Sequence, residues 1–372
     1  MVNPFLTKGY LGEAYFCDRK EESAKIISAI KNGRDLVIYG RRRMGKSALI
    51  THVYHKLGKK SLNVWVDLLP TNNMNDLVSY TASAILRSIN NDTSIGKKVW
   101  DGIKSLRPAM TFDELSGQPT VSFDITKEES RIKTFGELIQ VLTSTKKKIV
   151  LAFDEFQQIQ NYEEQNVEAQ LRTMLQTLPN ISFIFSGSDQ HMLMQMFENK
   201  DRPFYSFGQY MRLDRIEPSL YLEFIQNHFK KGKKKISEEN ILEIIEWCNY
   251  RTFNIQMVMN RLYSLDKKTL DRDDVRSVKE TILREKDEIY YTIRRLVTPG
   301  QWRVIEAFAK EGVIEAPYGK YFMKKYGFTN SSIIRRAVQT CLENNIFYNV
   351  YDNERSYYEI DDIFLRRWIM MI

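Results

Sequence analysis

An apolar run, a glycine-framed loop and a helical pattern follow one another in residues 36–50, LVIYGRRRMGKSALI. The β-branched and aromatic run at residues 36–39 predicts a buried strand. The loop after it fits the G-x-x-x-x-G-K-[ST] phosphate-binding pattern, and residues 47–53 have the spacing of a helix. A chance glycine-rich turn is the alternative, but the order strand, loop, helix is the context in which this pattern forms a phosphate site. The sequence therefore predicts an α/β domain that binds phosphate groups.

The residue types of the loop suit a nucleoside triphosphate. Gly40 and Gly45 allow backbone conformations that a β-carbon disfavours, so successive N–H groups can form an anion nest at the start of the helix. Lys46 adds a positive charge for the β- and γ-phosphates, and the Ser47 hydroxyl suits Mg²⁺, which prefers oxygen ligands. We expect nucleotide contacts along the loop and the first helical residues: Gly40, Arg41, Arg42, Arg43, Met44, Gly45, Lys46, Ser47 and Ala48.

A second buried strand, at residues 149–153, has no polar side chain and delivers Asp154 and Glu155 at its carboxyl end. This is a Walker B pattern. Asp154 would hold Mg²⁺ through its water shell, and Glu155 would orient or polarise the water that attacks the γ-phosphate. An apolar strand ending in two acidic residues is a weak signal alone. Together with the loop at Gly40, it predicts both halves of a site for ATP and Mg²⁺.

A third segment, residues 16–22, precedes the phosphate loop and reads FCDRKEE, which fits F-x-x-R-x-x-E. With the two motifs above, it resembles the AAA+-related, STAND-type prokaryotic ATPases often labelled archaeal-type ATPases. The resemblance implies an α/β, parallel-sheet P-loop NTPase domain of the AAA+ type, followed by a helical lid and a winged helix. It also implies that Phe16 and its neighbours, Arg19 among them, lie beside the nucleotide base. From the residues alone, Phe16 is as well explained as a core residue.

Strand patterns recur at residues 62–67, 181–185 and 210–213, and helical patterns separate them. With the two strands above they fit the parallel sheet that the resemblance implies. In that family, the strand matching residues 181–185 lies beside the Walker B strand, so a polar residue at its end could sense the γ-phosphate. Ser188 is our choice, with Ser186 close behind. A plain turn serine explains Ser188 equally well.

The chain departs from the family at two arginine positions. Family members carry a Pro-Leu-Tyr-Gly-Arg run before the last strand, and this chain has Gln209 where that arginine is expected. Arg202 and Arg212 are the nearest substitutes, and neither is at the matching position. A Gly-x-Pro turn starts the third lid helix in the family. This chain reads RTFN at residues 251–254 and lacks the proline, so only the position, and no complete motif, suggests Arg251 as a sensor arginine. The missing arginine at position 209 implies slow ATP hydrolysis unless a protein partner or self-association completes the site.

A chain of 372 residues is too long for one ordinary core. We expect an ATPase domain at residues 1–217, a helical lid at 218–296 and a winged-helix domain at 297–372. An insert at about residues 92–130 interrupts the first part, and its residues 110–114 and 120–124 predict a surface hairpin. In the lid, helical patterns occupy residues 220–229, 238–247 and 254–265, and one longer helix is expected at 273–291.

In the last part, residues 301–310, 319–326 and 331–344 predict three helices, and 347–351 with 356–360 predict a wing that turns at residues 352–354. Arg335 and Arg336 lie outside the apolar stripe of the third helix, so they are candidate DNA contacts. Residues 299–372 include ten basic and nine acidic residues, a net charge of +1, whereas DNA-binding modules more often show a clear basic face. Binding to protein, or packing on the ATPase core, is an equal alternative, and we expect weak DNA binding at most.

The composition excludes several classes of protein. No window approaches the roughly 18 apolar residues of a membrane span, and the first residues lack the pattern of a secretory signal. Cys17, Cys248 and Cys341 are far apart and odd in number, which favours reduced thiols in the cytoplasm. The net charge of +8 permits a nucleic-acid partner without requiring one. A lysine-rich run at residues 230–235 fits a binding patch or solvated charge equally well.

The favoured function is an ATP-dependent molecular switch. ATP and Mg²⁺ would join sheet to lid, hydrolysis would release the lid, and the C-terminal module would report the change to a partner. GTP is an alternative, although the chain has no Asn-Lys-x-Asp guanine motif. Two rivals belong to other classes: a scaffold that binds nucleotide and hydrolyses little of it, and a DNA-binding regulator that acts through the winged helix.

Overall fold

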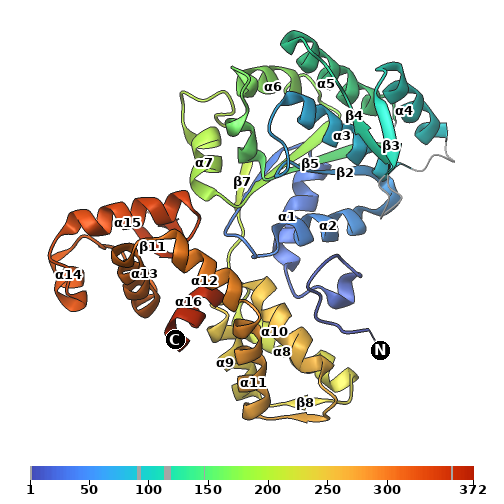
Figure 1. Cartoon of the computed structure of the whole chain (residues 1–372). Coiled ribbons are helices and arrows are strands. Elements are labelled where there is room, and N and C mark those ends of the chain that lie inside the picture. The colour runs from blue at the N-terminus through green and yellow to red at the C-terminus, as the bar shows by residue number, and fades with distance from the viewer. Residues whose placement is uncertain (1, 90–93, 113–118, 146, 353–354) are drawn as a thin grey trace. The chain divides into compact units, whose positions relative to one another are not determined.

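The computed structural model describes residues 2–89, 94–112, 119–145, 147–352 and 355–372 (Figure 1). The chain forms two compact units. The first unit is Lys8–Arg215, and the second is Ile216–Ile372 together with the N-terminal residues up to Thr7. The expected lid and winged helix therefore lie in one unit, and the division of the chain into three parts stays a prediction.

The first unit is built on a five-stranded sheet in the order β2-β5-β6-β1-β7. Its neighbouring strands are all paired in parallel. Strand β6 is buried along its whole length and β5 from its second residue, as expected for strands covered on both faces. This confirms the predicted parallel sheet, whose strands are β1 Leu36–Tyr39, β2 Ser61–Asp67, β5 Lys148–Asp154, β6 Ile181–Gly187 and β7 Gln209–Arg212.

Helices cover both faces of this sheet (Figure 1). On one face, α1 (Lys20–Lys31) and α2 (Lys46–Leu57) form an aliphatic core with strands β1, β5 and β6. On the other face, α3 (Met74–Ser88), α5 (Glu128–Thr143), α6 (Val167–Leu175) and α7 (Gln190–Glu198) share a larger core. Rings of Phe153, Phe156, Phe185, Phe197 and Phe204 meet in that second core. Both cores fix the ends of the strands, where the predicted site lies.

The insert contains a helix, α4 (Ser94–Ser105), and two antiparallel strands, β3 (Ala109–Phe112) and β4 (Pro119–Ser122). The predicted hairpin is confirmed, and its turn at Ser116-Gly117 lies outside the described residues. Strand β4 and the residue after it are bonded to α3, because the Val121 and Phe123 N–H groups donate to the Ser83 and Ser79 hydroxyls. The hairpin is thus fixed to the core of the first unit.

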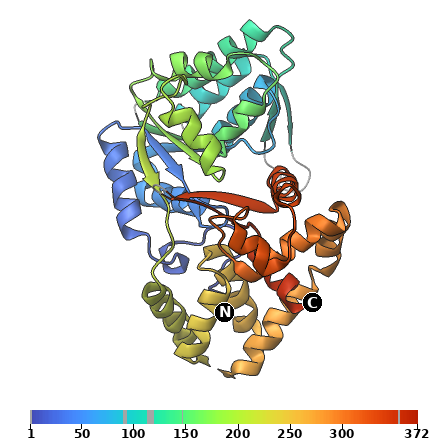
Figure 2. The ribbon, with the colours of Figure 1, turned by 90° about the vertical axis from the view of Figure 1, so that its left-hand side faces the viewer.

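In the second unit, α8 (Pro218–Lys231), α9 (Glu238–Trp247), α10 (Thr252–Ser264) and α11 (Arg272–Arg284) pack against one another (Figure 2). Two short parallel strands, β8 (Lys235–Ile236) and β9 (Thr269–Leu270), join their connections. The N-terminal residues are anchored here, since the Phe5 ring contacts Phe224, Phe229 and Tyr263.

The single helix expected at residues 273–291 is wrong. Helix α11 ends at Arg284, and α12 (Asp287–Leu296) begins after Lys286, which has φ −103° and ψ 0°. Asp287 and Glu288 then start α12, where the positive end of a helix dipole favours carboxylates. The helical pattern continues through the break, so the sequence alone did not reveal it.

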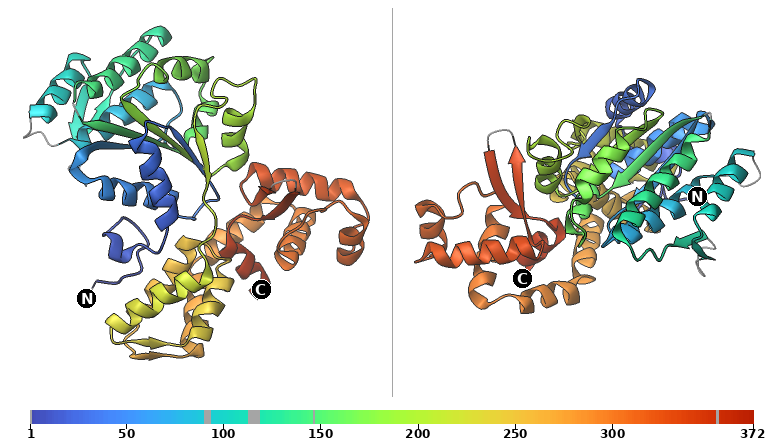
Figure 3. Two further views of the ribbon diagram at one scale, coloured as in Figure 1. Left: turned by 180° about the vertical axis from the view of Figure 1, so that it is seen from behind. Right: turned by 90° about the horizontal axis from the view of Figure 1, so that it is seen from above.

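The C-terminal module has the predicted helices α13 (Pro299–Glu311), α14 (Lys320–Tyr326) and α15 (Ser331–Glu343). The wing is confirmed as an antiparallel hairpin of β10 (Phe347–Asp352) and β11 (Arg355–Ile360), which projects from these helices (Figure 3). Two residues of its predicted turn, 353 and 354, lie outside the described residues. A final helix, α16 (Ile363–Met371), was not predicted, and its Phe364 and Trp368 side chains are fully buried.

Within the second unit, polar contacts tie the C-terminal module to the preceding helices. Trp368 Nε1 donates to Asp287 Oδ1 at 2.6 Å, and Arg367 Nε donates to the Trp247 carbonyl at 3.0 Å. All three cysteines are buried and none is in a disulfide. Among the described residues, no helix combines the length and the apolar character that a membrane crossing requires.

Candidate functional site

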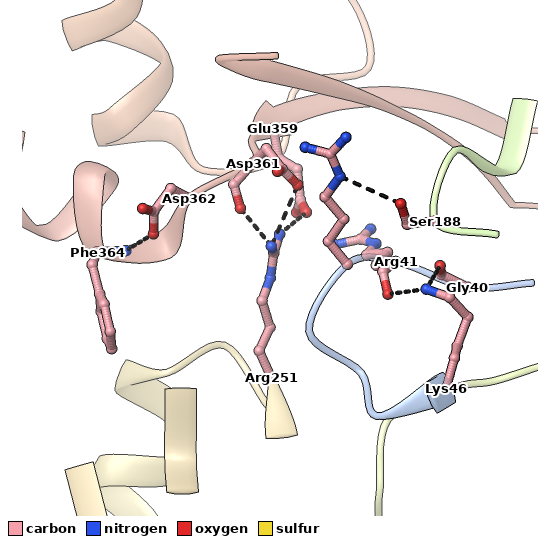
Figure 4. Close-up of polar contacts among 10 residues, drawn as sticks. Gly40, Arg41, Lys46, Ser188, Arg251, Glu359, Asp361, Asp362 and Phe364 are labelled. Carbon is pink, nitrogen blue, oxygen red and sulfur yellow. Dashed lines mark hydrogen bonds and ion pairs between the residues drawn. The ribbon is translucent and has the colours of Figure 1, made fainter. Parts of the chain in front are cut away.

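The predicted phosphate loop connects β1 to α2 at the carboxyl edge of the sheet. Gly45 caps α2 with φ 94°, a conformation that a side chain disfavours. A β-carbon on Gly40 would come within 2.8 Å of the Leu213 carbonyl oxygen, so only glycine allows this approach to the residue after β7. Lys46 is 6% exposed, and its Nζ donates to the carbonyls of Gly40 (2.8 Å) and Arg41 (3.0 Å), as Figure 4 shows.

The loop is joined to the acidic end of β5. Ser47 Oγ donates to Asp154 Oδ2 at 2.6 Å, and Ser186 Oγ donates to Asp154 Oδ1 at 2.6 Å. Asp154 is 5% exposed. Its buried carboxylate therefore has two hydroxyl donors, one from α2 and one from β6. The structure thus brings together the two residues expected to hold Mg²⁺. It also gives Ser186, the second choice as a sensor, a defined place on Asp154.

Glu155 lies in a left-handed backbone conformation, φ 56°, just after β5. Its Oε2 accepts three hydrogen bonds, from Gln157 Nε2 (2.6 Å), Ser188 N (3.0 Å) and Ser188 Oγ (2.8 Å). Burial alone would raise the pKa of Glu155. The hydrogen bond from Gln157, the charge of Lys46 and the two bonds from Ser188 outweigh it and hold the pKa of Glu155 below its ordinary value. Ser188 therefore bonds the carboxylate expected to act on water.

The other loop residues differ in exposure. Arg42 and Arg43 are exposed, whereas Met44 is buried. Arg42 Nε donates to Ser188 Oγ at 3.4 Å, a long bond that connects the loop to the end of β6. Ala48 lies in the first turn of α2 and is partly buried. Arg42 thus brings positive charge next to Ser188, which bonds the Glu155 carboxylate.

Phe16 and Arg19 lie on the same side as the loop. Arg19 is 4% exposed and donates to the Asp214 carbonyl at 2.6 Å and to Glu22 at 2.7 Å. Its Nη2 also lies 3.5 Å from the Met44 carbonyl, so Arg19 supports the phosphate loop. The Phe16 ring stacks on His52 of α2, with centroids 4.2 Å apart and planes at 13°.

Sequence reasoning missed the partners of that ring. The Tyr10 hydroxyl and His52 Nδ1 are 2.7 Å apart, and His52 is 2% exposed. Burial, followed by the charge of Lys56, lowers the pKa of His52. The signal in the sequence was the aromatic content of residues 10–16 opposite a histidine on the loop helix, which becomes visible only once the helix is placed.

The arginines considered as substitutes for the missing family arginine are each paired with a carboxylate. Arg202 pairs with Glu168, and Arg212 Nε lies 2.8 Å from Asp214 Oδ1. In the second unit, Arg251 is 2% exposed and its Nη2 lies 2.9 Å from Glu359 Oε1, with Asp361 as a further partner (Figure 4). Gln209 itself is exposed at the start of β7. The structure thus places the Arg251 guanidinium, the guessed sensor, on the acidic residues of the C-terminal module.

The residues around Ser47 and Asp154 fit Mg²⁺ bound together with a nucleotide. Among the described residues, no group of three or more His, Cys, Asp or Glu side chains could hold a metal alone. One hydroxyl and one buried carboxylate 2.6 Å apart supply hard oxygen atoms, which suits an ion that takes its other ligands from phosphates and water. The anion nest of the loop and the buried Lys46 supply the matching phosphate contacts.

The candidate DNA contacts lie on α15, where Arg335 and Arg336 are both exposed. The Arg335 guanidinium lies over the Tyr318 ring, 4.6 Å from its centroid. Lys324 and Lys325 of α14 are exposed as well, and Lys325 is bonded to Glu311 at 2.6 Å. The basic side chains of this module are thus partly neutralised by its own acids.

Comparison with protein families gives two matches. Residues 16–257 match a family described as an ATPase domain predominantly from Archaea. Residues 288–371 match a family described as a probable winged helix domain. No curated protein sequence matches the chain.

Solved structures share the fold at low sequence identity. The Walker-type ATPase of Pyrococcus abyssi is 16% identical, with a TM-score of 0.66 and 99% of each chain covered. The Aeropyrum pernix ORC2 protein, solved as ADPNP-ADP complexes, is 11% identical, with a TM-score of 0.59 over 99% of this chain and 98% of that one. The Aeropyrum pernix ORC1 protein in complex with DNA is 10% identical, with a TM-score of 0.52 over 96% and 93%.

Proposed function

Because the chain belongs to the family of ATPase domains found predominantly in Archaea, we propose that it binds ATP with Mg²⁺ at the loop between β1 and α2 and hydrolyses it slowly. One observation carries this proposal. The Ser47 hydroxyl of the loop is bonded to the buried Asp154 carboxylate of a separate strand, with Lys46 buried beside them. This arrangement joins a phosphate site and a cation site at one edge of the sheet. The ADPNP-ADP complexes of the ORC2 protein support the choice of an adenine nucleotide.

Each residue then has a separate task. The N–H groups of residues 41–47 receive the phosphates, and Lys46 leaves the carbonyls of Gly40 and Arg41 to meet the β- and γ-phosphate oxygens. Ser47 and Asp154 would hold Mg²⁺, which when bound supplies positive charge to the phosphate oxygens. Glu155 orients the attacking water and accepts its proton, while the bond from the γ-phosphorus to the ADP oxygen breaks.

Slow hydrolysis is expected because no arginine is available at the position that the family uses. Arg202 and Arg212 are paired with carboxylates, and Gln209 has no charge to offer. An arginine that meets the γ-phosphate can be worth ~10³ or more in rate. We infer that a partner or a second copy of the chain supplies this group, and that turnover then drives a switch read out through the winged helix.

A second candidate is DNA binding by the C-terminal module. The exposed Arg335 and Arg336 on α15 favour it, and so does the ORC1 protein solved with DNA. The net charge of +1 for residues 299–372 opposes tight binding. We therefore place a protein partner first and weak, sequence-tolerant DNA binding second.

A single-turnover assay tests the proposed hydrolysis. With enzyme in excess over ATP, Glu155→Gln should slow γ-phosphate release by ~10²-fold or more, since general-base catalysis contributes about that much. The same variant should keep its ATP affinity, because the nest, Lys46 and Asp154 are unchanged. Equal rates for the wild type and Glu155→Gln would contradict the assignment of Glu155. Many turnovers per second from a proven monomer would contradict the need for a further arginine.

A further inference from the structure

Gln157 is a buried amide next to the proposed catalytic acid, and neither the motifs nor the family match gives it a role. It lies near the start of the short 3-10 helix η3 (Phe156–Asn161), two residues after Glu155, and is 8% exposed. Its Nε2 donates to Glu155 Oε2 at 2.6 Å. Its Oε1 is buried without a hydrogen-bond partner. A buried amide oxygen without a hydrogen-bond partner costs folding free energy, so the position of Gln157 is not explained by a gain in stability.

The end of β6 leaves room for this amide. A β-carbon on Gly187 would lie 2.2 Å from Gln157 Oε1, so any side chain at position 187 would displace the amide. The next residue, Ser188, donates its N–H and its hydroxyl to the same oxygen of Glu155. Gly187 and Ser188 together therefore provide the space for one donor and supply the other two.

Three hydrogen-bond donors on one carboxylate oxygen fix the rotation of the Glu155 side chain. Two of them come from Ser188, the residue after β6, and one comes from η3, so the carboxylate is held by two segments of the chain. A base that must meet one water molecule benefits from such fixed orientation, because small displacements cost large factors in rate.

We propose that Gln157 is a positioning residue, which fixes the orientation of the Glu155 carboxylate toward the attacking water. This inference rests on the proposed ATP hydrolysis and adds a residue to it. Among the described residues, the Gln157 side chain forms no hydrogen bond with the phosphate loop or with Asp154, and its one bond is to Glu155. Replacing it should therefore slow the chemical step and leave the ATP affinity unchanged. Gly187 should act indirectly, because the absence of a side chain there leaves room for the Gln157 amide.

The test is a double-mutant cycle between Gln157 and Glu155 in the full chain. Gln157→Leu keeps the approximate volume and removes the donor, and its single-turnover rate should fall by ~10-fold to ~100-fold. The same substitution in a Glu155→Gln background should cause no further loss, since there is no carboxylate left to orient. The affinity for ATP, measured by calorimetry, should be the same in all four proteins.

Two further variants separate positioning from folding. Gly187→Ala should lower the rate about as much as Gln157→Leu, since its methyl group would displace the amide. Gln158→Leu is the matched control. It removes an equivalent amide bond, from Gln158 Nε2 to the Thr71 carbonyl at 3.0 Å, and leaves the backbone bond from Gln158 N to the Glu155 carbonyl in place. The control should keep the wild-type rate.

The outcomes distinguish this inference from the proposed function. Wild-type hydrolysis that depends on Glu155, together with an unchanged rate in Gln157→Leu, would overturn the role of Gln157 alone. Equal losses from Gln157→Leu in the wild-type and Glu155→Gln backgrounds would also overturn it, because the effect would then be general destabilisation. Hydrolysis that does not depend on Glu155 would overturn the proposed function and this inference together.

Discussion

The buried ion pair of Arg251 makes a quantitative prediction about the second unit. Arg251 and Glu359 are 2% and 4% exposed at their side chains, and Nη2 and Oε1 are 2.9 Å apart. Arg251 also donates to the Asp361 carbonyl. Arg251→Met keeps an apolar side chain of similar length but leaves the Glu359 carboxylate buried without its guanidinium. Breaking a buried pair from one side costs about 3–5 kcal/mol, mostly the penalty for the remaining charge.

The compensating change follows from the same reasoning. If the cost comes from the abandoned carboxylate, Arg251→Met combined with Glu359→Leu should recover most of it, since apolar replacement of a buried pair is often neutral. The matched control is Arg261→Met, because Arg261 and Glu285 form an ion pair at 2.6 Å but are 36% and 50% exposed. An exposed pair of this kind is worth about 0–1 kcal/mol.

Urea unfolding followed by tryptophan fluorescence measures these differences. Trp247, Trp302 and Trp368 report on the second unit if Trp65 and Trp100 of the first are replaced by Phe. With a slope of about 1–3 kcal/mol per molar urea, a loss of about 3 kcal/mol moves the midpoint down by about 1–3 M. A midpoint for Arg251→Met within ~0.3 M of the parent would refute the reasoning. A double variant as unstable as Arg251→Met would refute the assignment of the cost to Glu359.

Two further predictions concern pH and DNA. Burial lowers the pKa of His52 in the folded chain, so below pH 6.5, the ordinary pKa of histidine, the unfolded chain binds a proton more readily than the folded chain. The free energy of unfolding should therefore decrease as the pH falls through this range. Thermal unfolding from pH 5 to 7.5 should show a weaker pH dependence in His52→Gln than in the wild type. A slope equal to that of the wild type would contradict this origin. For the C-terminal module, fluorescence anisotropy over a salt series should show weak duplex binding, with the salt slope reduced by up to about two contacts in Arg335→Ala/Arg336→Ala. Nanomolar, sequence-selective binding lost in that variant would make the protein a DNA regulator.

The sequence predicted the elements that carry the phosphate site, because each combines a local pattern with a chemical requirement. Strand β1, the loop and α2 are read from a fixed spacing, and β5 from an uninterrupted apolar run before two acidic residues. The bond from Ser47 to Asp154 could be expected from these motifs, since the carboxyl ends of parallel strands share one edge of the sheet.

The remaining contacts depend on tertiary placement. Gln157 belongs to none of the sequence motifs, and its position beside Gly187 and Glu155 becomes visible only in the structure. The sequence could not rank Ser186 and Ser188 as sensors, because their different partners, Asp154 and Glu155, appear only once β5 and β6 lie side by side. Arg251 was judged by its position in the lid alone, whereas acidic residues more than 100 positions later decide its partner.

The break between α11 and α12 and the final helix α16 were missed for a related reason. Residues 284–288 contain no glycine or proline, so no local signal ends the first helix. The apolar residues of α16 are buried by contacts with other helices. The rings of Tyr290 on α12 and Trp302 on α13, for example, pack against Trp368.

Calorimetric titration with ATP tests the central claim, that one site binds nucleotide and Mg²⁺ through Lys46, Ser47 and Asp154. Lys46→Ala should weaken ATP binding by about 10-fold to 100-fold with or without Mg²⁺, the range for hydrogen bonds to a charged group. Ser47→Ala should weaken binding with Mg²⁺ and change it little in EDTA. Equal affinity of the wild type and Lys46→Ala for ATP in the presence of Mg²⁺ would contradict the account.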